Sequence, residues 1–265
     1  MAEPVRKMPA DREPQADPFR YGWRWQRVRL PSGEETVQQI PLTPEDLLNP
    51  ELDDEVPHSP AHFKLMHRLA TILMLFFEPR QDVLVTGDMK MLWGIPGLAE
   101  PAPDLVVIQD VRKRDALTQA SFDVVKEGTR PCLIIEVVSP LDDVEVRRND
   151  YERKVEIYQR TGIPEYLIYE TPAEETDCLL VIGYSMGPDG RYRRIEPDAQ
   201  GLLLSKTTGL LFGVDEDGQT PLVIEAVTGR RLLTSAQEEA ARKAAEAEVA
   251  RLRAELERLK KDAKG

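Results

Sequence analysis

Two carboxylates stand in apolar stretches where a charged side chain is costly. Asp104 begins the run "DLVVI", and Glu136 lies in the middle of "PCLIIEVVSP". Short runs of β-branched residues bounded by proline predict strands buried on both faces of a sheet. An ionised carboxylate left unpaired there costs on the order of several kcal/mol, so it is usually paired, protonated or bound to a cation. Two such acids on neighbouring strands suit a hard divalent cation and suggest phosphodiester chemistry.

Each acid taken alone also has a structural explanation. Asp104 could be a turn or cap residue after Pro103, and Glu136 could be half exposed on an edge strand, where acids are common. The pair, followed by a helix that carries Lys154, indicates a cation site. Because like charges repel in the site without metal, removal of either acid is expected to relieve strain and to raise the melting temperature in metal-free buffer.

Composition limits the classes of protein to which the chain can belong. Its 265 residues, 41% of them hydrophobic and 31% charged, can form one sizeable core with appendages. The most apolar helical run, Leu69–Phe77, is far shorter than the roughly 20 residues that cross a bilayer, and the N-terminus lacks an apolar signal core. We therefore expect a cytoplasmic protein without a membrane partner.

The net charge of −12 argues against nucleic-acid binding by a broadly basic surface. It does not exclude a nuclease, because a metal site built from carboxylates is itself acidic. The short basic stretches "VRKRD" at 111–115 and "VRRND" at 146–150 could hold phosphates, or they could be solvated loops.

The order of elements predicts an α/β fold. Residues 1–20 are rich in Pro, Asp, Glu and Arg and are expected to be disordered, whereas residues 21–234 form the domain. The domain begins with a hairpin around Pro31–Gly33 and a short helix opened by Thr43. A core helix capped by Ser59 follows, with its buried face at helical spacing: Phe63, Met66, Leu69, Leu73 and Phe76. The two acidic strands, a helix ending at Gly162 and further strands complete a mixed β-sheet flanked by helices.

The tail, residues 235–265, has a different composition, dominated by Ala, Glu, Arg, Leu and Lys. Ala245, Val249, Leu252, Leu256 and Leu259 alternate steps of four and three residues, which is the spacing of a coiled-coil seam. Only about two heptads are well formed. The pattern therefore allows either a homodimer contact or a solvated helix.

Three motifs resemble a known family when they are taken together. "PAPDLVVI", "CLIIEVVSP" and "RNDYERKVEIYQRTGIPEYLIYE" are similar in order and spacing to the Uma-two family of restriction endonucleases, a branch of the PD-(D/E)XK nuclease superfamily. The resemblance covers roughly residues 41–234. It implies a restriction-endonuclease-like core and metal-dependent cleavage of nucleic acid.

The resemblance also implies roles for individual residues. Asp104 and Glu136 would hold Mg²⁺ or Mn²⁺, together with a backbone carbonyl near Val137. The superfamily places a lysine two residues after the glutamate, but Val138 occupies that position here, and Lys154 on the following helix is its substitute by resemblance.

The roles of four residues stay open. Lys154 could instead only pair with Asp150 one helical turn earlier, and Asp150 is itself an accessory candidate for the site. His62 could assist the site or be a surface histidine, and Ser139 could end the strand or contribute its hydroxyl.

We therefore expect a Mg²⁺-dependent endonuclease that hydrolyses phosphodiester bonds, with DNA a better candidate substrate than RNA. Two alternatives remain at this stage. The chain could be an inactive nuclease-like module that binds nucleic acid, since fold does not determine function. It could also be an interaction protein that acts through its helical tail.

Overall fold

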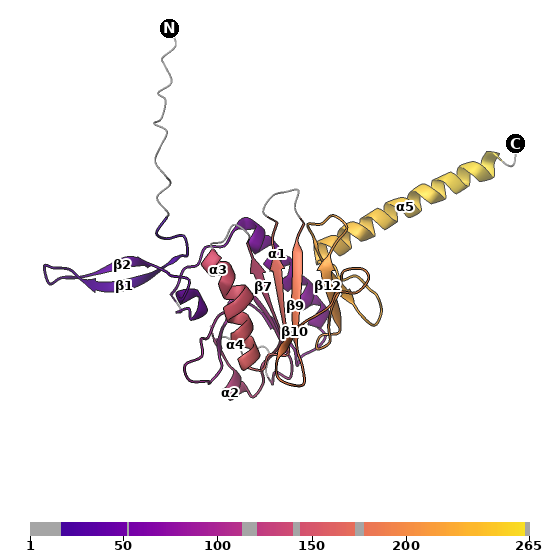
Figure 1. Cartoon of the computed structure of the whole chain (residues 1–265). Coiled ribbons are helices and arrows are strands. Elements are labelled where there is room, and N and C mark those ends of the chain that lie inside the picture. Colours follow the sequence, from indigo (N-terminus) through magenta and orange to yellow (C-terminus); the bar gives the residue numbers. More distant parts are fainter. Residues whose placement is uncertain (1–16, 52, 113–120, 140–143, 173–177, 263–265) are drawn as a thin grey trace, which may run out of the picture.

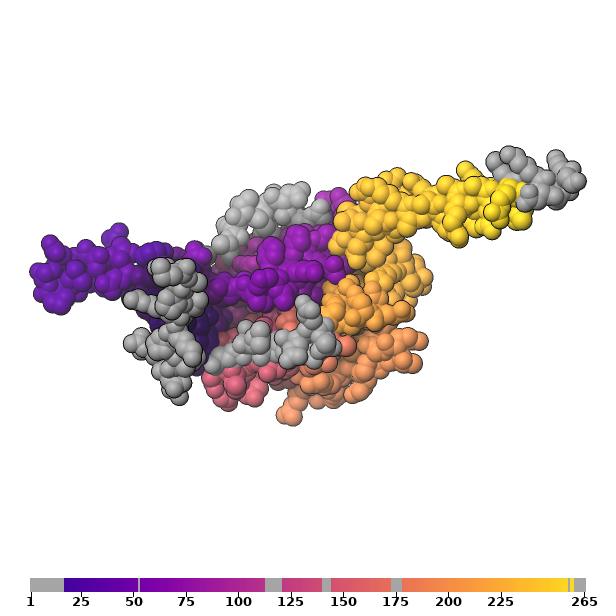
Figure 2. Space-filling model, turned by 90° about the horizontal axis from the view of Figure 1, so that it is seen from above, coloured from indigo at the N-terminus to yellow at the C-terminus, as the bar shows by residue number. Residues whose placement is uncertain are grey.

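The computed structural model describes residues 17–51, 53–112, 121–139, 144–172 and 178–262. A body built on one mixed sheet carries a hairpin at one end and a long helix at the other, as Figures 1 and 2 show. The segment predicted to be disordered, 1–20, lies outside the described residues except for its last four positions. None of the described helices combines the length and the apolar composition that a membrane span requires.

The central sheet has six strands in the order β10-β9-β8-β7-β5-β3. β7 and β8 run parallel, and their neighbours are antiparallel, so the sheet is mixed as predicted. A parallel pair needs a crossover connection, and the helical segment between β7 and β8 provides it. The strands are β3 (Leu84–Thr86), β5 (Leu105–Ile108), β7 (Pro131–Val138), β8 (Glu165–Glu170), β9 (Leu180–Met186) and β10 (Tyr192–Arg194).

Successive side chains of β7 point to opposite faces of the sheet and enter two separate apolar cores. Leu133, Ile135 and Val137 pack in the core that includes α1 (Pro60–Phe77), whereas Ile134 and Val138 pack in the core that includes α4 (Lys154–Arg160). Because β7 is buried on both faces, its residues form an almost continuous apolar run.

Smaller elements complete these layers. A three-stranded antiparallel sheet contributes apolar side chains to the α1 core, and a parallel pair of short strands precedes the helix α2 (Val124–Glu127). The crossover from β7 to β8 begins with α3 (Val144–Arg148) and a π-helical turn, η3 (Asn149–Arg153), before α4. The small strands are β11 (Leu203–Ser205), β12 (Leu210–Val214), β13 (Pro221–Glu225), β4 (Lys90–Leu92) and β6 (Ser121–Asp123).

The two appendages were both predicted from local patterns. β1 (Trp23–Arg29) and β2 (Glu35–Pro41) form the antiparallel hairpin around Pro31–Gly33. At its base, the Arg24 guanidinium pairs with three acids of the body, Asp46, Glu51 and Asp54, at N–O distances between 2.7 and 3.2 Å. The tail is a continuous helix, α5 (Ser235–Asp262), which points away from the body in Figure 1.

Two helical predictions need correction. Ser59 does cap α1, since its Oγ accepts a hydrogen bond from the His62 N–H, but Phe63 is 58% exposed and does not belong to the buried face. Apolar residues surround most of this helix, so periodicity alone did not identify the side that meets the sheet. The helix predicted after Thr43 is only one 3-10 turn, η1 (Asp46–Leu48), because Asn49 precedes Pro50 and is disfavoured in the helical conformation.

Candidate active site

The register of the sheet brings the two buried acids together. Leu105 of β5 pairs with Ile135 of the antiparallel strand β7, so the preceding Asp104 lies opposite the following Glu136. The Asp104 N–H lies 3.4 Å from Oε2 of Glu136 and donates to it. β7 is an inner strand of the sheet, and Glu136 is only 1% exposed, which excludes the edge-strand explanation.

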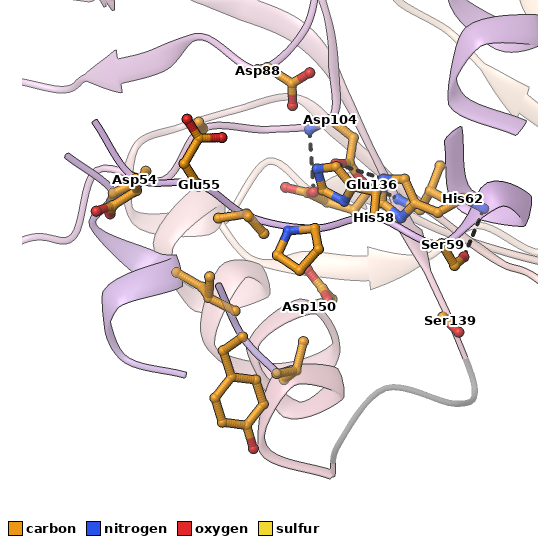
Figure 3. Close-up of a pocket in the computed structure, with 18 of the residues that line it drawn as sticks. Asp54, Glu55, His58, Ser59, His62, Asp88, Asp104, Glu136, Ser139 and Asp150 are labelled. Carbon is orange, nitrogen blue, oxygen red and sulfur yellow. Dashed lines mark hydrogen bonds and ion pairs between the residues drawn. The ribbon is translucent and has the colours of Figure 1, made fainter. Parts of the chain in front are cut away.

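Asp104 is held by a backbone donor and by a histidine. The N–H of Val137 donates to Asp104 Oδ2 at 2.6 Å, and His62 Nε2 lies 3.3 Å from Oδ1. His62 is a buried residue on the first turns of α1 and not the surface histidine that the sequence also allowed. The ring of His58 stacks on His62 with 4.3 Å between centroids, and Figure 3 shows both rings beside the acidic pair.

Glu136 is held by two residues of α4. Tyr158 Oη donates to Oε1 at 2.7 Å, and Lys154 Nζ lies 3.0 Å from Oε2. The same ammonium lies 2.7 Å from Oδ1 of Asp150, so Lys154 is shared between two carboxylates. Asp150, Lys154 and Tyr158 follow one another at steps of four residues and therefore lie along one face of the helical segment.

A π-helical turn lies directly before Lys154. Residues Asn149–Arg153 adopt this wider turn between α3 and α4, and π-turns occur frequently at functional sites. Tyr166 of β8 supports the turn, because its hydroxyl donates to the Asp150 carbonyl oxygen at 2.9 Å. The helical connection is thus tied to the sheet at the point where it presents Asp150 and Lys154.

These groups line a pocket of about 690 Å³. Its lining includes Asp104, Glu136, Lys154 and Asp150, together with His58, His62, Asp88, Lys90 and Ser139. Figure 3 shows Asp104 and Glu136 of the sheet beside the histidines of the α1 region, with Asp150 of the crossover segment nearby. The side chains predicted to do chemistry therefore line a cavity that has room for part of a substrate.

The two buried acids and Lys154 differ in their electrostatic surroundings. Burial would raise the pKa of Asp104, but the hydrogen bond and charge of His62, with the Lys154 charge and the Val137 N–H, lower it to about 2. Burial raises the pKa of Glu136 to about 8, because Lys154 offsets only part of burial and of the repulsion from the other acids. Burial opposes the charge of Lys154, yet Asp150 and Glu136 raise its pKa and keep it protonated.

The structure brings together all six residues that were singled out from the sequence. Asp104, Glu136, Lys154, His62, Asp150 and Ser139 are buried or nearly so, and all of them line the pocket. Val138, at the superfamily's lysine position, is fully buried in the apolar core below α4, so a lysine there would have to displace core packing.

Sequence reasoning missed two residues of this site. Tyr158 was not singled out, although its position four residues after Lys154 indicated that the two side chains share a face. Asp88 lines the pocket with a left-handed backbone, at φ 52°, which is uncommon for a residue other than glycine. Burial and the charge of Asp104 raise its pKa. No sequence signal identified Asp88.

The two arginines of the second basic stretch are paired with acids. Arg147 pairs with Glu170, and Arg148 pairs with Glu152 on the same helical segment. Most of the stretch at 111–115 lies outside the described residues.

The donor chemistry of the site fits a hard cation, with one constraint of geometry. Asp104 and Glu136 present oxygen ligands to the pocket. However, each of their four oxygens already has a donor of the chain within 3.3 Å, namely Val137 N–H, His62, Tyr158 or Lys154. Within the described residues, no three His, Cys, Asp or Glu side chains are arranged as a metal site. A cation held by this pair would have to displace His62 or Lys154 from an oxygen.

Comparison with known proteins places this site in a family. Residues 35–217, from β2 to just beyond β12, match the model of the Uma2 family, which is described as "Putative restriction endonuclease". No curated protein matches the chain. A solved structure of a putative nuclease of the DUF820 group from Anabaena variabilis is similar, with 16% identity and a TM-score of 0.39 over 56% of this chain and 74% of that one. Because the family match covers more than half of the chain, the protein belongs to the Uma2 family of restriction-endonuclease-like proteins.

Proposed function

We propose that the protein is a metal-dependent endonuclease that hydrolyses phosphodiester bonds, with DNA as its substrate. The observation that carries the proposal is the juxtaposition of Asp104, Glu136 and Lys154 in one pocket. The description of the family as restriction endonucleases supports DNA over RNA. Two carboxylates and an ammonium supply the ligands for a hard cation and a donor to a phosphate oxygen.

In this proposal, Asp104 and Glu136 hold Mg²⁺ or Mn²⁺. When bound, such a cation polarises the scissile phosphate and lowers the pKa of a water molecule. Lys154 turns from Glu136 Oε2 towards a phosphate oxygen and keeps its contact with Asp150 Oδ1. In that position its ammonium stabilises the negative charge that develops in the transition state.

Two further residues position the acids. His62 approaches Oδ1 of Asp104, and Tyr158 donates to Oε1 of Glu136, so each carboxylate is oriented from one side. Side chains that fix ligand orientation in this way commonly change metal affinity about 10- to 100-fold when they are removed.

Cleavage assays with matched variants test the proposal. Wild-type protein should nick or linearise supercoiled plasmid, or cleave single-stranded oligonucleotides, with Mg²⁺ or Mn²⁺ and not with EDTA. Asp104→Asn and Glu136→Gln should abolish this activity, whereas Glu55→Gln, which changes an exposed acid of the same pocket, should retain it. Full metal-dependent activity in either of the first two variants would refute the assignment.

A second function is favoured by one specific observation. Because the four oxygens of the acidic pair are already engaged within the chain, the site could remain closed to metal, and the protein would then bind nucleic acid without cleaving it. Calorimetric titration with Mn²⁺ separates the two functions. Mn²⁺ binding by the wild type that disappears in Glu136→Gln supports the endonuclease. A wild-type protein that binds DNA but not Mn²⁺ supports the binding module.

A further inference from the structure

The helix α5 exposes a row of large apolar side chains. Val249, Leu252, Leu256 and Leu259 are between 47% and 55% exposed, although they recur at the three- and four-residue steps of one helix face. Figure 1 shows α5 extending away from the body, where the described part of the chain offers nothing to cover this row. An exposed apolar row of this kind on a helix commonly marks a surface for a partner.

The residue types in the row are those of a two-stranded coiled coil. With heptad positions a to g, Val249 and Leu256 occupy a, and Leu252 and Leu259 occupy d. A β-branched residue at a with leucine at d favours two parallel strands, and Val249 with Leu252 has this combination in the first of the two heptads. The outward f positions, Ala247 and Ala254, are small and do not compete as a second apolar contact.

The charges beside the row favour one orientation of the partner. In a parallel pair, position g of one helix faces the next e position of the other, so Glu248 of one copy meets Arg253 of its partner. In an antiparallel pair, g faces g, and both Glu248 and Glu255 would face acids. Glu248 meets an opposite charge only in the parallel arrangement, and this pair forms twice in a symmetric dimer.

We propose that α5 pairs with α5 of a second copy of this chain in a parallel, in-register coiled coil. The partner is a second copy because the charges of α5 complement those of an identical helix. Since α5 begins at Ser235, directly after the body, a parallel pair holds both bodies at the same end of the coil. The two pockets then belong to one symmetric assembly. The dimer does not depend on nuclease activity, and the molar mass of the protein in solution tests it separately.

The first experiment compares an inward substitution with an outward one in the full-length protein. Leu252→Glu places a charge in the seam, whereas Ala254→Glu makes the same change of charge on the opposite side of α5. Light scattering over a concentration series should show a dimer for the wild type and for Ala254→Glu, and a monomer for Leu252→Glu. Circular dichroism of both variants controls for loss of the helix itself.

The second experiment tests the orientation. Glu248→Lys and Arg253→Glu each turn both attractive pairs into repulsive ones, so each variant alone should dimerise about thirtyfold more weakly, or about 2 kcal/mol. When the two variants are mixed, the introduced lysine of one copy meets the introduced glutamate of the other, while the second pair keeps its native residues. The mixture should therefore recover a dimer of wild-type stability.

Three results would overturn the proposal. A wild-type protein that is monomeric at every concentration with α5 folded excludes the dimer, and a dimer that survives Leu252→Glu places the contact elsewhere. Tighter association of Glu248→Lys alone would indicate an antiparallel pair, because that change removes repulsion between acidic g positions.

Discussion

Replacement of Lys154 by methionine separates a catalytic ammonium from a structural one. The change keeps most of the side-chain volume and removes the charge that lies 3.0 Å from Glu136 Oε2 and 2.7 Å from Asp150 Oδ1. The side chain of Lys154 is only 12% exposed, so water cannot replace the ammonium fully. Glu136 and Asp150 are left without their shared partner.

The size of the effect on stability follows from this geometry. Loss of one partner of a buried ion pair costs about 3 kcal/mol, which lowers the melting temperature of a protein of this size by about 6–12 °C. The loss should be smaller below about pH 8 than above it, because a protonated Glu136 carries no uncompensated charge. A calorimetric scan at two pH values measures both effects.

We expect Lys154→Met to have a separate effect on the cleavage rate. If Lys154 stabilises charge that develops only in the transition state, turnover should fall about a hundredfold. Metal affinity should not weaken, since the ammonium no longer competes for Glu136 Oε2. Single-turnover cleavage at saturating Mg²⁺ measures the first quantity, and calorimetric titration measures the second.

Lys90→Met is the matched control, because Lys90 lines the same pocket but donates to the Pro50 carbonyl oxygen, away from the acids. It should keep the wild-type cleavage rate. If Lys154→Met is less stable but cleaves at the wild-type rate, the lysine only neutralises buried acids and the catalytic reasoning is wrong.

Three further predictions concern the acids and the backbone that carries them. Asp104→Asn should lose about 2 kcal/mol of stability at pH 7, because the pKa of Asp104 is lowered to about 2 and its charged form stabilises the fold at pH values above the ordinary pKa near 3.8. The difference in stability from the wild type should vanish as pH falls through about 2. Denaturant titrations at several pH values measure this difference. The pKa of Glu136 is raised to about 8, so its contribution to stability is full below about pH 4.5 and is lost as pH rises through 8. Glu136→Gln should remove that part of the pH dependence of stability. The Mn²⁺ affinity of the wild type, measured by calorimetric titration, should increase over the same rise in pH. Gly87→Ala should unfold or inactivate the protein, because its Cβ would lie 2.0 Å from the Asp104 carbonyl oxygen, and the melting temperature and a cleavage assay would show this. The control is Gly33→Ala, whose added Cβ meets no atom within 4 Å beyond its chain neighbours, although its left-handed φ adds some strain.

The contrast between the two acids corrects a simple expectation from charge. Repulsion alone predicted that removal of either acid would stabilise the protein. In the structure, His62 and the Val137 N–H compensate Asp104 fully, whereas Glu136 shares Lys154 with Asp150. We therefore expect destabilisation by Asp104→Asn and a pH-dependent gain only for Glu136→Gln.

The sequence by itself determined the local elements and singled out the candidate site residues. Proline-bounded apolar runs predicted β5 and β7, the Ser59 cap predicted the start of α1, and Gly162 predicted the end of α4. These features depend on backbone preferences and on the period of apolar residues, which are properties of neighbouring positions in the chain. Order and spacing of the motifs also identified the acids and the displaced lysine.

Only the tertiary structure decided how these residues meet. The pairing of Leu105 with Ile135 sets Asp104 opposite Glu136, and strand register is a contact between segments distant in sequence. The choice of buried face on α1, which turned His62 inward and Phe63 outward, depended on where that helix packs. The hydrogen bond from Tyr158 and the left-handed backbone of Asp88 likewise arise from packing of the crossover and the loop against the sheet, because neither position is distinguished by its local sequence.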